Sequence, residues 1–369
     1  MRSTPALILC DPQVGATEIA TLTLLDRLLV TLHRAGCAPI TVVCRGELPT
    51  LRRAPALGIV PGVVGDVPPI GEPTLVAEAC LLIQAEDVRS VIEGGGRLAT
   101  SDGRRLPLGL TSRLGEDIGE TLAGLPTVRA DGVAEAVTDT DSGHQAESRL
   151  WQSLAGPTDG LVDRYFNRPL GRRLSKMLIR TPITPNQVTV GSTLIGMLGA
   201  WFFSRDTNGG ALLGALLFQL SALVDCVDGE VARVVFKESS VGKRLDVWFD
   251  QAVHVAVFTA ISVGLWRAGT GAPVLWLGGS TVVGALIAFA VVLRGQGRSG
   301  SHRNARLNRL ILGVTSRDFS VLLICLALIG RLEWFLWIAG IAVHLFWISA
   351  LWLQSPWQRG ESSARIETT

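Results

Sequence analysis

The chain has 369 residues, of which 18% are charged, compared with about 25% in an average soluble domain, and its formal net charge is +2. This composition excludes a disordered, collagen-like or coiled-coil protein, and the near-neutral charge predicts no nucleic-acid partner. The six cysteines contain no CxxC pair, so neither a disulfide framework nor a zinc site is predicted. All ten tryptophans, all eleven phenylalanines and the single tyrosine lie at Trp151 or later. We therefore expect water around the first part of the chain and lipid around most of the second.

Short apolar strands alternate with helical patterns in the first part of the chain. Strands are predicted at 6–10 and 40–44, a helix at 22–34 that stops at Gly36, and a strand–helix pair at 75–84 and 86–93. The polar stretch 128–145 is expected to close this region. Alternation of this kind predicts a small α/β sheet, and we expect a cytoplasmic α/β domain over residues 1–150.

Residues 151–186 are predicted to be a linker that contains an amphipathic helix. The stretch 161–179 carries four arginines and one lysine between apolar side chains. Such a pattern is typical of a helix at the membrane interface, with its basic residues facing anionic headgroups. An ordinary surface helix that joins two domains is the alternative.

Six apolar spans follow, most of them close to the roughly 20 residues that cross a bilayer. We expect an all-α domain of six transmembrane helices over 187–354 and a cytoplasmic tail over 355–369. These spans predict an integral membrane protein, in the inner or plasma membrane if the source is bacterial. Basic residues concentrate in alternate loops, so the positive-inside rule predicts that both termini are cytoplasmic. The same rule puts the inner ends of the second and third spans, where we expect the active site, on the cytoplasmic side. The spans are 187–204, 209–224, 247–266, 271–293, 319–330 and 334–353.

Four aspartates lie at helical spacing around the inner ends of the second and third spans. Asp225 and Asp228 share one helix face with Gly229 and Ala232, and Asp246 and Asp250 share another with Gly242. Two neighbouring helices with this spacing point four carboxylates at one space, and the small residues leave that space open for a ligand.

Carboxylates at membrane depth are costly unless they are paired or functional. Two divalent ions, Mg²⁺ or Mn²⁺, balance four carboxylates and suit phosphoryl transfer. Ion pairs of these acids with Arg233, Lys243 and Arg244 are one alternative. A metal-ion transporter or cation channel is another, although it leaves the interleaved small residues and Arg233 unexplained.

The string DxxDGxxARx(8)GxxxDxxxD over 225–250 resembles the signature of the CDP-alcohol phosphotransferase (phosphatidyltransferase) family, with all eight fixed positions present. The resemblance implies a transferase that moves a phosphoryl-alcohol group from a CDP-alcohol to a hydroxyl acceptor and releases CMP. It implies metal binding by Asp225, Asp228 and Asp246, and a general base at Asp250 that also suits a metal ligand. It implies nucleotide contacts at Asp225, Gly229, Ala232, Arg233 and Gly242.

Further contacts are expected at the start of the first span and in an arginine-rich loop. In the family, a Pro-Asn-x-x-Thr segment lies beside the nucleotide, which makes Asn186 and Thr189 candidates; Thr184 and Pro185 also suit a plain helix start. Arginines clamp phosphate well, so Arg294, Arg298 and Arg303 are candidates for binding a phosphorylated acceptor, with membrane topology as the alternative. The pair Gly210 and Gly214 is expected to let helices pack closely, and it is only weak support for a homodimer.

Residues 5–150 are loosely similar to the nucleotidyltransferase-like domain of bifunctional inositol-phosphate cytidylyltransferase and di-myo-inositol-phosphate-phosphate synthases. The glycine-rich loop expected after the first strand is replaced by 10–16, so phosphate-cradling amides are lost and a degenerate domain is predicted. The fusion suggests a phospholipid-synthesis enzyme with an inositol-phosphate-type acceptor and a CDP-diacylglycerol or CDP-inositol donor. A nucleotide-sensing domain on a silent membrane scaffold is the alternative.

Overall fold

The computed structural model describes residues 3–115, 117–154, 161–205, 207–297 and 319–354. The chain divides into two compact units. Unit 1 comprises Met1–Leu154 together with Ala232–Lys237, and unit 2 comprises Ala155–Val231 and Glu238–Thr369. Unit 1 is therefore assembled from two separate stretches of sequence.

Unit 1 is built on a seven-stranded sheet in the order β10-β8-β9-β6-β1-β4-β5. Only β9 runs antiparallel to its neighbours in this sheet. The small pairs β2 (Glu18–Ile19) with β3 (Leu22–Thr23) and β7 (Leu81–Leu82) with β11 (Glu135–Ala136) lie outside it. The main strands are β1 (Thr4–Cys10), β4 (Cys37–Cys44), β5 (Gly62–Val64), β6 (Thr74–Glu78), β8 (Arg97–Ala99), β9 (Arg105–Thr111) and β10 (Thr127–Arg129).

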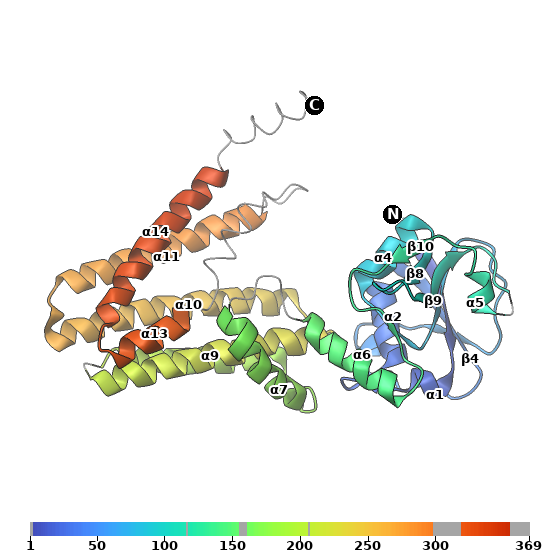
Figure 1. The fold of residues 1–369 in the computed structure, drawn as a ribbon, viewed down its shortest axis with the longest axis horizontal. Helices are drawn as coiled ribbons and strands as arrows, with labels where there is room; N and C mark the ends of the chain where they lie inside the picture. The colour runs from blue at the N-terminus through green and yellow to red at the C-terminus, as the bar shows by residue number, and fades with distance from the viewer. Residues whose placement is uncertain (1–2, 116, 155–160, 206, 298–318, 355–369) are drawn as a thin grey trace, which may run out of the picture. The chain divides into compact units, whose positions relative to one another are not determined.

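Helices cover both faces of the sheet, because alternate residues of each strand point to opposite sides. Ile8 and its neighbours pack with α2 (Leu24–Arg34) and α4 (Ala85–Gly94). Leu7 and Val76 pack on the other face against α5 (Ile118–Thr121). Figure 1 shows α2 and α5 on either side of the strands. The predicted α/β region is confirmed.

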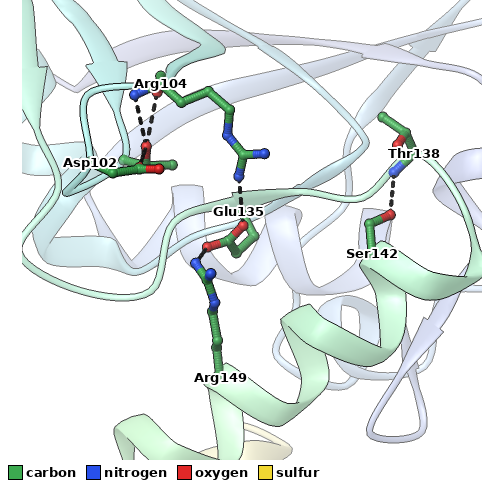
Figure 2. Close-up of polar contacts among 7 residues, drawn as sticks. Asp102, Arg104, Glu135, Thr138, Ser142 and Arg149 are labelled. Carbon is green, nitrogen blue, oxygen red and sulfur yellow. Dashed lines mark hydrogen bonds and ion pairs between the residues drawn. The ribbon is translucent and has the colours of Figure 1, made fainter.

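Polar contacts secure the end of unit 1. The helix α6 (Thr140–Ser153) begins at Asp139, which caps it within the polar stretch expected to close the domain. The carboxylate of Glu135 on β11 binds Arg104 at 2.8 Å and Arg149 of α6, as Figure 2 shows. Unit 1 consequently continues to Leu154, where buried Trp151 donates to Glu147.

Unit 2 is helical. Four of its helices are, by length and composition, suited to cross a membrane: α9, α10 with its continuation to Thr270, α11 and α14. The described part of α13 is shorter, and α8 carries several polar residues, so the predicted six transmembrane helices are not confirmed. The elements are the π-helical turn η1 (Asp163–Asn167), α7 (Arg168–Leu178), α8 (Pro185–Phe203), α9 (Asn208–Val234), α10 (Ser240–Leu265), η2 (Trp266–Thr270), α11 (Pro273–Gly297), α13 (Phe319–Leu328) and α14 (Leu332–Gln354).

Small residues allow the helices of unit 2 to approach closely. A side chain on Gly199 of α8 would lie 3.0 Å from the carbonyl of Gly214 on α9. The helices α11 and α14 pack along each other, as Figure 1 shows, with Gly284 against His344. Gly214, one of the two glycines expected to let helices pack closely, thus packs against α8 of this chain.

Candidate metal and nucleotide site

Three carboxylates meet between α9 and α10. Asp225, Asp228 and Asp246 each offer an oxygen, and these oxygens all lie within 4.8 Å of one another. Asp225 and Asp228 are buried, with 8% and 7% of their surface exposed. Buried carboxylates held this close repel one another unless positive charge lies between them, so the group suits a divalent cation.

Local helix geometry explains why these three side chains converge. Asp225 and Asp228 are three residues apart on α9 and therefore face the same side. The helix α10 begins after Ser239, whose hydroxyl oxygen accepts a hydrogen bond from the Gly242 amide at 2.9 Å. This start places Asp246 in the second turn of α10, opposite the α9 pair.

Asp250 lies one turn after Asp246 on the same face of α10 and is half-buried. It is not among the three carboxylates that meet within 4.8 Å in the described residues. The structure therefore brings together three of the four predicted aspartates and places the fourth one helical turn farther along.

The start of α8 borders the same space. The Thr189 hydroxyl donates a hydrogen bond to Oδ2 of Asp228 and also lies 3.1 Å from the Pro185 carbonyl. A Cβ atom added at Gly242 would lie 2.8 Å from Oδ1 of Asn186. Thr184 caps α8 through a capping box with Gln187, which fixes where this turn begins. Asn186 and Thr189 consequently lie beside the predicted site.

The remaining predicted residues have mixed positions. Gly229 and Ala232 are half-buried, and Arg233 is exposed. Arg294 is exposed near the end of α11, whereas Arg298 and Arg303 lie outside the described residues. His254, one turn after Asp250, lies among the rings of three phenylalanines, Phe218, Phe258 and Phe319.

Sequence reasoning missed the buried polar residues behind the site. Glu230, treated only as a spacer in the signature, is fully buried and pairs with Arg168 and Ser175. Asn167 is also fully buried and bonds Gln219 of α9. The sequence did offer a signal for Glu230: two residues after Asp228, a helix rotates this carboxylate away from the face that carries Asp228.

In unit 1, packed residues occupy the loops after β1 and β4. A Cβ atom at Gly15 would lie 2.9 Å from Cys10 Sγ, and one at Gly46 would lie 3.3 Å from Pro12. Burial raises the pKa of the Cys10 thiol to about 12, which makes it a poor nucleophile. A cavity of about 320 Å³ lies between the start of α6 and the β2 region, and its charged lining includes Glu18, Asp139 and Glu147. Neither place resembles a phosphate cradle.

Parts of the chain are similar to known proteins. Residues 182–352 match the family described as CDP-alcohol phosphatidyltransferase. The bifunctional IPC transferase and DIPP synthase of Archaeoglobus fulgidus is 30% identical over 220 residues, 58% of this chain and 43% of that protein. The protein of the same name from Thermococcus kodakarensis is 34% identical over 143 residues, 37% of this chain and 32% of its own length.

Among solved structures, phosphatidylinositol phosphate synthase of Mycobacterium tuberculosis with CDP-DAG bound aligns with a TM-score of 0.37 and 18% identity, covering 50% of this chain and 92% of that chain. The present chain spans less than half the length of either curated relative. The signature at 225–250 falls within the matched region. Over residues 182–352, the chain is therefore similar to the CDP-alcohol phosphatidyltransferase family.

Proposed function

We propose that this chain is an integral-membrane CDP-alcohol phosphotransferase, which moves a phosphoryl-alcohol group from a CDP-alcohol to an acceptor hydroxyl and releases CMP. The observation that carries the proposal is the convergence of Asp225, Asp228 and Asp246 from two helices, beside Asn186 and Thr189 at the start of a third.

Two divalent ions, Mg²⁺ or Mn²⁺, fit this site. Its donors are all carboxylate oxygens, which hard cations prefer, and they lie close enough to share an ion. Asp225, Asp228, Asp246 and Asp250 would hold the ions. When bound, the metal would neutralise the diphosphate of the donor and the charge that develops on the leaving CMP.

The residues of the chain divide the remaining work. Asp250 would take the proton of the acceptor hydroxyl, whose oxygen then forms a bond to the phosphorus that carries the alcohol. The bond from that phosphorus to the bridging oxygen breaks, and CMP keeps that oxygen. Contacts to the nucleotide would come from Asn186, Thr189, Asp225, Gly229, Ala232, Arg233 and Gly242.

The acceptor is proposed to be an inositol-phosphate-type or other polar alcohol of phospholipid synthesis, with CDP-diacylglycerol or CDP-inositol as the donor. The names of the curated relatives support this class, because both are described as IPC transferases and DIPP synthases. A phosphate on the acceptor would bind Arg294, Arg298 or Arg303, since guanidinium groups bind phosphate in a bidentate manner.

For topology, we propose that α8 and α13 complete six spans with the four long apolar helices, and that both termini and the active site face the cytoplasm. The arginines and lysines of alternate loops support this orientation. The α/β region is proposed to be a degenerate nucleotidyltransferase-like domain, because packed side chains occupy the loops after β1 and β4.

The test is CMP release by the full chain in nanodiscs. CDP-diacylglycerol and CDP-inositol would each be offered with a panel of inositol phosphates and other alcohols, with and without Mg²⁺ or Mn²⁺. We expect metal-dependent CMP from the wild type and from the control Asp141→Asn, whose side chain is exposed on α6. Asp250→Asn should lower the rate of CMP release at least about 100-fold, the usual size of a general-base effect.

Two outcomes would contradict the proposal. One is a folded, Mn²⁺-binding protein that releases no CMP from any pair. The other is Mn²⁺ uptake into liposomes without CMP release, which would instead identify a transporter.

A further inference from the structure

Glu230 is a fully buried carboxylate on α9, the helix that also carries Asp225 and Asp228. It follows Asp225 by five residues, so at 100° per residue it is rotated by about 140° from the face that carries the metal-binding carboxylates. A buried charge is costly unless it is paired and hydrogen-bonded. The partners of Glu230 therefore indicate what this second face of α9 does.

Both oxygens of Glu230 bind the amphipathic helix α7. Arg168 Nη1 lies 3.1 Å from Oε1, and the Ser175 hydroxyl donates to Oε2 at 2.8 Å. Between them, Gly171 brings α7 close to α9, since a Cβ atom there would lie 3.4 Å from Val227. The side chains of Arg168 and Glu230 are 13% and 1% exposed, so water screens this pair little.

A second set of buried contacts joins the same two segments. Asn167 donates to Asp163 at 2.8 Å and accepts from Gln219 Nε2 of α9 at 2.7 Å. Gln219 in turn accepts a hydrogen bond from Ser320 of α13. Gln219 lies on the same face of α9 as Glu230, eleven residues earlier. The segment 163–178 is thus fixed at two places to the back of α9, the face that points away from Asp225 and Asp228.

The opposite side of this segment is suited to a lipid surface. Tyr165, Phe166 and Met177 are 74%, 50% and 67% exposed, and the basic side chains Arg173 and Lys176 are exposed beside them. Aromatic and apolar side chains next to basic ones are typical of a helix in the headgroup region.

We propose that Glu230 is a positioning residue that locks the interfacial helix α7 to the back of α9 and so sets the height of the carboxylate site relative to the lipid headgroups. The inference rests on the proposed function, because it assigns the site a donor anchored in the bilayer. The anchor of such a donor fixes the depth of its diphosphate, and a displaced α7 would misalign that diphosphate with the carboxylates.

The test compares Glu230→Gln with Glu333→Gln, a matched control at the other end of unit 2 on α14. CDP-diacylglycerol is presented in phosphatidylglycerol and phosphatidylcholine vesicles to the full chain. We expect Glu230→Gln to raise KM for this donor about tenfold, with the Mn²⁺ dissociation constant changed less than twofold. Arg168→Ala should act in the same way, and Arg168→Lys should recover most of the loss. A loss in kcat with weaker Mn²⁺ binding and unchanged KM would overturn the proposal, because Glu230 would then act on the metal site itself.

A spin label at Met177→Cys, in a chain whose exposed Cys325 is replaced by Ser, provides a readout that needs no turnover. We expect the label to become more mobile in Glu230→Gln and to remain unchanged in Glu333→Gln. Equal mobility in both variants would overturn the proposal. If the wild type releases no CMP, the proposed function fails, while the label still decides whether Glu230 holds α7.

Discussion

At the scale of single residues, Gly242 shows why the site requires a residue without a side chain at one position. Its amide donates a hydrogen bond to the hydroxyl oxygen of Ser239, which caps the start of α10, and its missing side chain leaves room for Asn186 of α8. The glycine therefore lets two helices meet at the point where the carboxylates converge. The sequence spacing predicts an opening for a ligand at Gly242, and in the structure Asn186 lies beside this opening.

Gly242→Ala should lower kcat/KM for CMP release by about 100-fold. The new Cβ atom would lie 2.8 Å from Oδ1 of Asn186, so the side chain of this proposed nucleotide contact has to move, and displacements near 1 Å cost about this much in positioned catalysis. Gly191→Ala on α8 is the matched control, because nothing lies within 4 Å of a Cβ atom there. Equal activity of the two variants in the CMP assay would show that the approach of Asn186 does not matter.

At the scale of elements, buried polar side chains fix segments that hydrophobic periodicity leaves loose. In unit 1, Asp87 of α4 accepts hydrogen bonds from the amides of Asp131 and Gly132 at 2.9 and 3.3 Å, which ties the segment after β10 to this helix. In unit 2, Glu230 joins α7 to α9. Burying such groups costs desolvation, and the buried Oδ2 of Asp87 makes no hydrogen bond within the described residues.

Asp87→Asn should stabilise unit 1 at neutral pH. Burial raises the pKa of the Asp87 carboxyl, so this group favours folding below its unfolded pKa, and that contribution is lost as pH rises through its folded pKa. Asparagine keeps the acceptor for both amides and removes the charge. We expect several-fold greater amide protection in α4 at pH 7 in the full chain.

Near pH 3, below the unfolded pKa of the carboxyl, the same substitution should leave the protection of α4 unchanged. A gain that is equal at both pH values would mean that burial of the charge is not the cause.

At the scale of the whole molecule, unit 1 takes in a segment from the middle of the signature. Residues Ala232–Lys237 belong to it, although 1–150 contains no aromatic residue of its own. The Phe236 ring lies under the guanidinium of Arg34, 4.9 Å from its centre, and the Phe236 carbonyl accepts from Arg53 Nη2 at 2.7 Å. Phe236 has a positive φ of 55°, and these contacts stabilise this unfavourable backbone conformation.

Phe236→Ala should therefore destabilise unit 1 by about 2 kcal/mol, somewhat less than a fully buried Phe→Ala change, because the side chain is half-buried. Amide protection of α2 in the full chain measures this effect. Phe289→Ala on α11 in unit 2 is the control and should leave α2 unchanged. If the amides of α2 are equally protected in Phe236→Ala and Phe289→Ala, the Phe236 side chain does not stabilise unit 1.

The sequence by itself determined the features that depend on short-range spacing. Strand alternation predicted the sheet, and the absence of aromatics before Trp151 separated it from the apolar helices. Steps of three and four residues put Asp225 and Asp228 on one face, because helix geometry fixes neighbours at that distance. The same spacing carries the resemblance to the family signature over 225–250.

Only the tertiary structure decided which distant segments meet. Glu230 pairs with Arg168, 62 residues earlier in the chain, and Phe236 packs into a unit whose other residues end at Leu154. Local periodicity records which face of a helix is apolar, and it does not record which element covers that face. The partner is chosen by shape and by the need to satisfy buried charge, and both arise only once the chain has folded.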